Sequence, residues 1–252
     1  MKQWFKNVLV SLRSSGGASA PPTQPGGLEV KRLIDEIRAA HLTYCGPPKL
    51  ENLSEAVMRV CREGVKGDFI EAGVALGGSA ILLGKLKPSH AILRLYDVFS
   101  MIPPPGTNDG EDAHQRYHEI RSGNSSGLGG NTYYGYMDQL LEQVAANLAT
   151  FGLDCEADHI ELVPGLFDDT LHPQGAVACA HVDCDWYDPV RICIDRILPK
   201  LSCGGVLVFD DYSSYSGCRR AVDELLAQRN DLEVLFHRRS IGLRRVLIRA
   251  AR

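Results

Sequence analysis

The sequence predicts an α/β fold: a doubly wound sheet of seven strands, mostly parallel with one antiparallel edge strand, and helices on both faces. The first observation is a series of short apolar runs, each of strand length and most of them separated by helical patterns. The runs are Asp68–Ala72, Ala91–Asp97, Ile160–Val163, Val177–Asp183, Gly205–Asp210, Glu233–His237 and Arg244–Ile248. Buried parallel strands have this near-continuous apolar character because helices cover both of their faces. The second observation is that only Arg238–Leu243 joins the last two runs, which is too short for a helical crossover and predicts an antiparallel pair.

Two helices are expected before the first strand, because apolar residues recur there at helical spacing. One face holds Leu28, Val30, Leu33, Ile34 and Ile37, and the next holds Leu50, Leu53, Val57, Val60 and Cys61. The expected folded domain covers residues 28–252. Its long insertion, at about residues 99–131, contains a helical pattern over Asp109–Arg121 and a glycine-rich stretch. A segment of this kind beside the carboxyl ends of the strands is placed to act as a lid over a ligand.

Residues 1–27 are expected to form a flexible N-terminal segment. Ser14–Gly27 is rich in proline, glycine and small polar residues, which bury too little surface to offset the entropy of ordering the chain. Apolar residues ahead of it, among them Trp4, Val8 and Leu12, leave two interpretations open. They form either a frayed tail or a short helix that binds a membrane surface or a partner. The apolar run is too short for the core of a signal peptide, so secretion is not supported.

The composition excludes two classes of protein. The chain has 27 lysines and arginines against 31 aspartates and glutamates, so it lacks the basic surplus of a nucleic-acid-binding protein. No stretch approaches the roughly 18 apolar residues that a membrane helix needs, which excludes an integral membrane protein. The eight cysteines contain no CxxC pair and lack the spacing of a disulfide framework. We therefore expect reduced thiols and a cytoplasmic protein.

The first predicted strand leads directly into a glycine-rich turn, where a chain can approach a bound nucleotide closely. The spacing is Glu71-x-Gly73-x-x-x-Gly77-Gly78, which differs from the GxGxxG of dinucleotide sites and lacks the Lys-Ser/Thr of a phosphate loop. NAD and ATP are therefore disfavoured. Asp97 ends the second strand, where a carboxylate can accept hydrogen bonds from both ribose hydroxyls of an adenosine. An acidic turn together with a ribose-binding aspartate fits S-adenosylmethionine, which has two cationic groups and no pyrophosphate.

Carboxylates also end two later strands. Asp183 closes the fourth run, and Asp210 and Asp211 close the fifth. If these strands are neighbours, the carboxylates meet at one edge of the sheet, where their like charges should raise one another's pKa unless a cation neutralises them. Mg²⁺ suits such a site, because it accepts carboxylate oxygens and keeps positions for water or substrate oxygens. A hydroxyl bound there would be oriented and acidified. His181, in the same strand, is interpreted as a packed core histidine.

Several segments, taken in order, resemble the macrocin O-methyltransferase (TylF/MycF) family, metal-dependent enzymes that methylate sugar hydroxyls of antibiotics and related glycosylated products. The resemblance extends from about Leu42 to the C-terminus. The segments that show it are GDFIEAGVALGGSA, Leu95-Tyr-Asp97, GNTYYGYMDQLLEQVAANLATFGL, GLFDDTL, AHVDCDWYDP and GGVLVFDDYSSYSGCRRAVDE. It implies a Rossmann-like methyltransferase domain and homo-oligomers. The chain departs from many relatives at Ala75 and Leu76, where they carry a bulky and a basic residue, and at Val98-Phe99-Ser100, so the acceptor stays undetermined.

Carried over residue by residue, the resemblance implies a cofactor site and a metal site. The cofactor residues are Glu71, Gly73, Gly77 and Ser79 at the methionine end, Asp97 on the ribose, and Phe167 and Asp168 beside the adenine. The implied Mg²⁺ ligands are Asp183, Asp210 and Asp211, and Asp183 is also the expected general base. Asp185 would orient the site from behind the metal ligands.

The sequence thus predicts a magnesium-dependent O-methyltransferase that moves the methyl group of S-adenosylmethionine to a small-molecule acceptor, a hydroxyl of a sugar or other glycosylated natural product. One alternative is a nicotinamide-dependent oxidoreductase on a similar sheet, against which the missing GxGxxG argues. The other alternative is a partner protein that kept the methyltransferase fold and lost its chemistry. Such a protein would be expected to lack one of the converging aspartates, and all of them are present.

Overall fold

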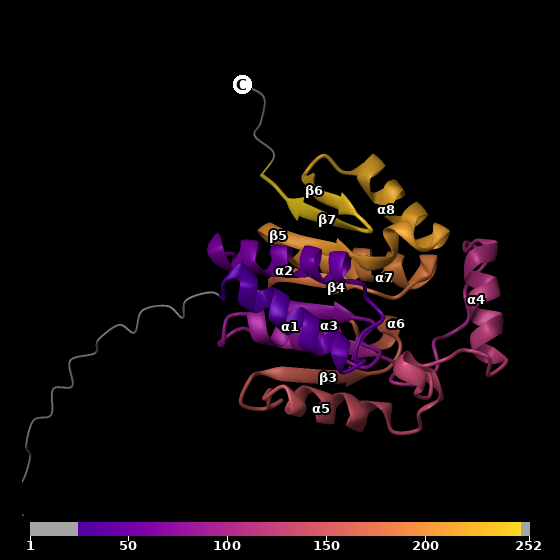
Figure 1. Ribbon diagram of the computed structural model, residues 1–252. Coiled ribbons are helices and arrows are strands. Elements are labelled where there is room, and N and C mark those ends of the chain that lie inside the picture. The colour runs from indigo at the N-terminus through magenta and orange to yellow at the C-terminus, as the bar shows by residue number, and fades with distance from the viewer. Residues whose placement is uncertain (1–24, 248–252) are drawn as a thin grey trace, which may run out of the picture.

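The computed structural model describes residues 25–247, which contain a seven-stranded sheet with the order β3-β2-β1-β4-β5-β7-β6 (Figure 1). The strands are β1 (Asp68–Ala72), β2 (Leu93–Asp97), β3 (Ile160–Pro164), β4 (Val177–Val182), β5 (Leu201–Phe209), β6 (Leu232–Arg238) and β7 (Ser240–Arg245). Strands β1 to β5 pair in parallel. This arrangement confirms the predicted fold class. The N-terminal helix or tail expected within residues 1–24 lies outside the described residues, and the flexible segment stays a prediction.

The antiparallel hairpin at one edge is tighter than the sequence predicts. Strand β7 begins only one residue after β6 ends, whereas the sequence predicts a connection over Arg238–Leu243. Arg239 makes the turn, with a φ of 65°. Strand β7 pairs with β5 on one side and β6 on the other, antiparallel to both. The glycine that interrupts the apolar pattern here, Gly242, lies against the ring of Phe236, since an added Cβ would come within 2.4 Å of that ring.

Helices cover both faces of the sheet, as the sequence predicts. Those on one face share an apolar cluster with residues of β1 and β2. They are α1 (Gly27–Ala39), α2 (Pro47–Arg62), α3 (Gly78–Leu86) and α5 (Leu140–Thr150). Those on the other face share a second cluster with residues of β4 and β5. They are α6 (Phe167–Thr170), α7 (Tyr187–Ile197) and α8 (Ser216–Gln228).

The two helices expected before the first strand are α1 and α2. Helix α1 buries Val30, Ile34 and Ile37, while Leu28 at its start is 83% exposed. Helix α2 begins with two prolines, Pro47-Pro48, a favourable start because the first helical residues need no N–H donor and proline already has a helical φ. This start fixes the position of the loop before α2 and of its first turn.

The insertion crosses the carboxyl ends of the strands. Its helix α4 (Glu111–Arg121) stands beyond the arrowheads of the parallel strands, at the right of Figure 1. The short 3-10 helices η1 (Leu128–Gly130) and η2 (Tyr134–Tyr136) follow it. Asp112 ties α4 to the start of α8, because its carboxylate accepts hydrogen bonds from Ser216 N at 2.7 Å and Ser216 Oγ at 2.6 Å.

Two findings bear on the expectations from composition. Within residues 25–247, no helix combines the length and the apolar character that crossing a bilayer requires. All eight cysteines lie in this part of the chain, and none of them forms a disulfide.

Candidate active site

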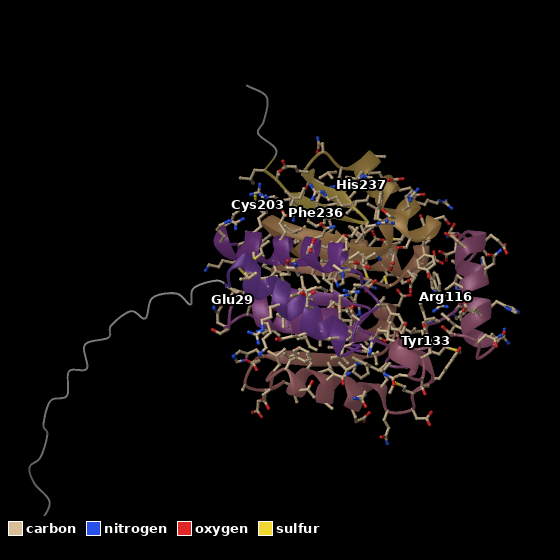
Figure 2. The ribbon with its side chains drawn as sticks, viewed as in Figure 1. Glu29, Arg116, Tyr133, Cys203, Phe236 and His237 are labelled. Atoms are coloured by element: carbon tan, nitrogen blue, oxygen red, sulfur yellow. The ribbon has the colours of Figure 1, made fainter. Side chains whose placement is uncertain are left out.

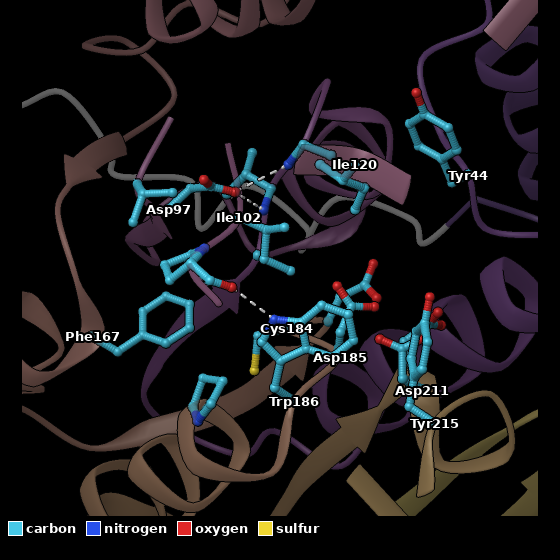
Figure 3. Close-up of a pocket in the computed structure, with 18 of the residues that line it drawn as sticks. Tyr44, Asp97, Ile102, Ile120, Phe167, Cys184, Asp185, Trp186, Asp211 and Tyr215 are labelled. Atoms are coloured by element: carbon cyan, nitrogen blue, oxygen red, sulfur yellow. Dashed lines mark hydrogen bonds between the residues drawn. The ribbon is translucent and has the colours of Figure 1, made fainter. Parts of the chain in front are cut away.

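A cavity of about 410 Å³ opens at the carboxyl ends of the parallel strands, beneath the insertion. This volume lies within the range of small-molecule sites. Most of the predicted site residues line it, namely Gly73, Asp97, Phe167, Asp168, Asp183, Asp210 and Asp211. The remaining ones, Glu71, Gly77 and Ser79, are buried behind the lining. Figure 3 shows the two ends of the pocket, with Asp97 and Phe167 at one end and Asp185, Asp211 and Tyr215 at the other.

The glycine turn after β1 brings two loops into direct contact. Gly73 has a φ of 91°, and a Cβ on it would lie 1.8 Å from the backbone oxygen of Asp183. The amide of Asp183 donates to Ala72 O at 2.8 Å, which joins the end of β4 to the end of β1. Gly77, with a φ of 85°, caps the start of α3. Only glycine fits the Gly73 position, so this residue is required by the packing of the pocket floor itself.

Asp97 fastens this turn at the Phe167 end of the pocket. Its Oδ2 accepts hydrogen bonds from Val74 N at 2.6 Å and Ala75 N at 3.2 Å (Figure 3). Its Oδ1 accepts one from Phe99 N at 2.8 Å. Burial raises the pKa of Asp97, and the three backbone donors offset only part of that rise. The aspartate and the turn therefore form one unit, from which Asp97 lines the cavity.

The acidic end contains two aspartates, which the sequence predicts to lie close together, and a cysteine, which the sequence does not predict there. Asp183 follows β4 and Asp210 follows β5, which are neighbouring parallel strands. Cys45 Sγ, from the loop before α2, lies 3.5 Å from Asp183 Oδ2 and 3.6 Å from Asp210 Oδ2. In the part of the chain that the structure describes, this is the one group of three residues whose possible metal-ligand atoms all lie within 4.8 Å of one another. Asp211 lines the same end of the pocket outside that group.

Lys49, in the first turn of α2, already supplies one positive charge to this end. Its Nζ lies 2.5 Å from Asp210 Oδ2 and 3.3 Å from Asp211 Oδ1. Burial raises the pKa of Asp183 well above its ordinary value, and repulsion from the two other aspartates adds to the rise. Asp210 Oδ1 and Asp211 Oδ2 are buried and have no hydrogen-bond partner among residues 25–247. The cluster therefore has oxygens to offer to a further cation.

Glu71 and His181 form a buried pair beneath the acidic end. They are neighbours across β1 and β4. His181 Nδ1 lies 2.8 Å from Glu71 Oε1, and Nε2 lies 3.7 Å from Asp210 Oδ1. Burial alone would lower the pKa of His181, but Asp210 and Glu71 raise it well above its ordinary value. The histidine is packed in the core, as the sequence predicts, and it lies between two carboxylates. Glu71 is directed at His181, so its role at the cofactor stays a prediction.

Aromatic side chains from three loops, together with residues of the insertion, form the opposite wall. Arg116 of α4 lies over the ring of Tyr133, 5.6 Å from its centre, and the two are labelled close together at the right of Figure 2. The ring of Tyr44 packs edge-on against Tyr133 at 6.2 Å. Trp186 Nε1 donates to Pro103 O at 3.0 Å, the dashed line at the centre of Figure 3. The lid-like insertion thus forms part of the pocket wall and is bonded to the loop after β4.

Sequence reasoning missed Cys45 and Lys49. Neither belongs to a recognisable motif, and each lies more than 130 positions from the aspartates that it meets, since Cys45 and Asp183 are 138 residues apart. One local signal was available. The two prolines predict that a helix begins at Pro47, and the start of that helix fixes where the residues around it lie.

Comparison with known proteins identifies the family. A model of the family described as macrocin O-methyltransferase (TylF) matches residues 31–237. The 8-demethyl-8-(2,3-dimethoxy-alpha-L-rhamnosyl)-tetracenomycin-C 4'-O-methyltransferase of Streptomyces olivaceus is 33% identical over 189 residues, which are 72% of this chain and 66% of that protein. The demethyldecarbamoylnovobiocin O-methyltransferase of Streptomyces niveus is 30% identical over 192 residues, which are 74% of this chain and 68% of that protein.

A solved structure agrees with these relatives. The O-methyltransferase NovP superposes with a TM-score of 0.69 and 26% identity, covering 86% of this chain and 88% of that one. The family match spans the glycine turn, the strand-end aspartates and the insertion, all of which meet at one pocket. The chain therefore belongs to the macrocin O-methyltransferase (TylF) family, a family of O-methyltransferases.

Proposed function

We propose that this protein transfers the methyl group of S-adenosylmethionine to a hydroxyl of a sugar or other glycosylated natural product, with the help of Mg²⁺. The observation that carries the proposal is that one cavity joins the turn held by Asp97 to the carboxylates of Asp183 and Asp210. A methyl donor bound at the first end would face an acceptor bound at the second. The family and the relatives' names support O-methylation, and the tetracenomycin enzyme is named for a rhamnosyl compound.

The Phe167 end of the pocket suits the donor. In the proposal Asp97 holds the ribose, Phe167 and Asp168 border the adenine, and the turn at Gly73 lines the space for the methionine part. Glu71, Gly77 and Ser79 act from behind the lining, where they fix the shape of the turn. Donor and acceptor held in line lose little further entropy on reaction, so positioning alone lowers the barrier.

The acidic end suits a divalent cation. One buried carboxylate oxygen, Asp211 Oδ2, has no hydrogen-bond partner among the described residues, and carboxylates are preferred ligands of Mg²⁺. In the proposal Asp183, Asp210 and Asp211 hold the ion, which when bound would polarise the acceptor hydroxyl and make it more acidic.

Asp183 is the proposed general base. It accepts the proton of the acceptor hydroxyl while that oxygen forms a bond to the methyl carbon. The bond between carbon and sulfur breaks, its electron pair stays on sulfur, and S-adenosylhomocysteine leaves. Asp185 adjoins Asp183 with an uncommon φ of 58° and lines the same end, from which it would orient the site.

Thermal unfolding with added ligands tests the donor. S-adenosylhomocysteine at about 100 times its dissociation constant should add about 2.7 kcal/mol to the free energy of unfolding, and NADH should add nothing. Stabilisation by NADH alone would favour the oxidoreductase alternative. Transfer of labelled methyl groups from S-adenosylmethionine to a panel of glycosides then separates an enzyme from an inactive partner protein. The cytoplasmic location, homo-oligomers and the lack of nucleic-acid partners stay predictions from the sequence.

A further inference from the structure

Cys45 occupies a position that the proposed magnesium site does not account for. Its side chain is buried, at 7% exposure, and the residue lines the pocket at the acidic end. Its sulfur contacts an oxygen of Asp183 and an oxygen of Asp210. The loop before α2 therefore places a sulfur atom, a soft metal ligand, beside two carboxylate oxygens, which are hard ligands.

The spacing of these atoms matches the edge of a tetrahedral metal centre. A tetrahedral ion with a metal–sulfur bond of about 2.3 Å and a metal–oxygen bond of about 2.0 Å separates sulfur from oxygen by about 3.5 Å. The two distances from Cys45 Sγ to the carboxylate oxygens are 3.5 and 3.6 Å. A site built only for Mg²⁺ would be surrounded by oxygen atoms.

A second observation points to a ligand at the same place. Asp211 is 6% exposed, yet its Oδ2 has no hydrogen-bond partner within residues 25–247, whereas Asp210 Oδ1 faces His181 Nε2 at 3.7 Å. An unpartnered buried oxygen costs free energy, and a cation bound to it would remove that cost. Asp211 lies beside the group of Cys45, Asp183 and Asp210, so it or a substrate oxygen can complete the coordination.

We propose that Cys45 is a thiolate ligand of the metal ion, and that this centre therefore prefers a borderline divalent cation such as Zn²⁺ or Co²⁺ to Mg²⁺. The inference rests on the proposed metal site of Asp183 and Asp210. Binding of the ion releases the thiol proton to solvent. It also requires Lys49 Nζ to leave Asp210 Oδ2, and Asp211 Oδ1 and Ser214 Oγ, each 3.3 Å away, can receive it.

The test uses the full chain, freed of metal and titrated with Co²⁺. A bound thiolate gives a near-ultraviolet charge-transfer band, whereas oxygen ligands give none, so the absorption reports the ligand and needs no activity. The variants are Cys45→Ser and, as a matched control, Cys203→Ser. Cys203 is exposed and lies at the opposite end of the molecule from Arg116 and Tyr133 of the pocket (Figure 2).

We expect the band in the wild-type chain and in Cys203→Ser and its loss in Cys45→Ser. The affinity for Co²⁺ should fall about tenfold or more in Cys45→Ser, while that for Mg²⁺ should change less than about threefold. Bound Co²⁺ without a band, or a band that survives in Cys45→Ser, would overturn the inference and leave only a thiol hydrogen bond. If Co²⁺ and Mg²⁺ both fail to bind, the proposed metal site is wrong as well. The experiment therefore distinguishes failure of the thiolate ligand from failure of the whole metal site.

A measurement without variants guards against a substitution that unfolds the chain. Alkylation of the cysteines by iodoacetamide, read by mass spectrometry, should be slowed at Cys45 by Zn²⁺ and much less by Mg²⁺ at matched occupancy. Cys203 should react at the same rate in all samples. Equal protection of Cys45 by the two cations would contradict the inference.

Discussion

Charge balance at the acidic end of the pocket depends on Lys49 when no metal is bound. Its ammonium group contacts Asp210 and Asp211, which are both buried. Loss of that cation leaves carboxylates without compensation in a poorly solvated site. A metal ion would supply the missing charge, and it would also have Lys49 as a competitor for Asp210.

Lys49→Met should therefore lower the free energy of unfolding when no metal is bound and lower it much less when a metal is bound. In chelator the variant should lose about 3 kcal/mol of unfolding free energy relative to the wild-type chain. Added divalent cation should restore most of that loss and bind more tightly than to the wild type. Urea unfolding with and without cation measures both effects, with Lys200→Met on the surface as control. An equal loss under both conditions would mean that no cation takes the place of Lys49.

The proposed base is tested by Asp183→Asn, which keeps the shape of the side chain and removes its charge. Turnover should fall about 100-fold or more, as expected for loss of a general base, while S-adenosylhomocysteine should bind with nearly unchanged affinity. Methyl-transfer rates and calorimetric titration provide the two readings, and Asp195→Asn on the exposed side of α7 is the control. Unchanged turnover would show that Asp183 is neither base nor essential metal ligand.

Residues of the site could be predicted from sequence where they end strands. Asp97, Asp183 and Asp210 follow buried apolar runs, and the parallel order brings all such ends to one edge. Cys45 and Lys49 could not be predicted, because their place depends on how α2 packs across the sheet. The direction of Glu71 also escaped prediction, since it depends on the register that pairs Glu71 with His181.

Among the elements, the hairpin of β6 and β7 depends on one close contact. Gly242 of β7 lies under the ring of Phe236 of β6, and a methyl group at position 242 would overlap it. Strand β6 is the edge strand and β7 lies between it and β5, so the contact has no neighbour beyond β6 to absorb a shift.

Gly242→Ala should destabilise the fold by about 2 kcal/mol through overpacking. Phe236→Leu makes room for the methyl group, so the double variant should lose less stability than the sum of the two single losses. Urea unfolding of the four proteins gives the coupling free energy directly. Additive losses would show that the hairpin relaxes around the methyl group and that the contact is not tight.

The elements were predictable to the degree that apolar patterning defines them. The buried strands β1, β2 and β4 agree closely with their apolar runs. The last strand was placed too far along the chain, because Gly242 breaks the run and the left-handed turn at Arg239 has no sequence signature. The insertion was recognisable only as a long irregular segment, and its bonds to the loop after β4 come from tertiary packing.

Over the whole molecule, the insertion closes the pocket through few contacts with the sheet. The hydrogen bond from Trp186 to Pro103 O joins it directly to the loop that carries Asp183 and Asp185. Asp112 anchors its helix to α8. Asp109 Oδ1 also accepts from Tyr187 N at 2.7 Å, and Asn108 donates to Asp188 Oδ1 at 3.2 Å. Because these bonds go to a loop and to the starts of helices, the insertion should open locally without unfolding of the rest.

Trp186→Phe removes the bond to Pro103 and keeps the aromatic packing. We expect faster hydrogen exchange over residues 99–131 and a rise of about fivefold in the KM for the acceptor, the equivalent of about 1 kcal/mol for one hydrogen bond. Affinity for S-adenosylhomocysteine should stay nearly constant. Trp4→Phe, the substitution of the other tryptophan in the chain, is the control. Unchanged exchange in the insertion would show that this bond does not hold it closed.

The contact between Gly73 and the backbone of Asp183 has a consequence for cooperativity. The turn proposed to face the donor and the loop proposed to face the acceptor touch with no space for even a methyl group, so neither can shift without moving the other. Any displacement that a bound donor imposes on Gly73 is therefore passed to Asp183. Thermodynamic linkage makes such an effect reciprocal: if the donor strengthens acceptor binding by some factor, the acceptor strengthens donor binding by the same factor.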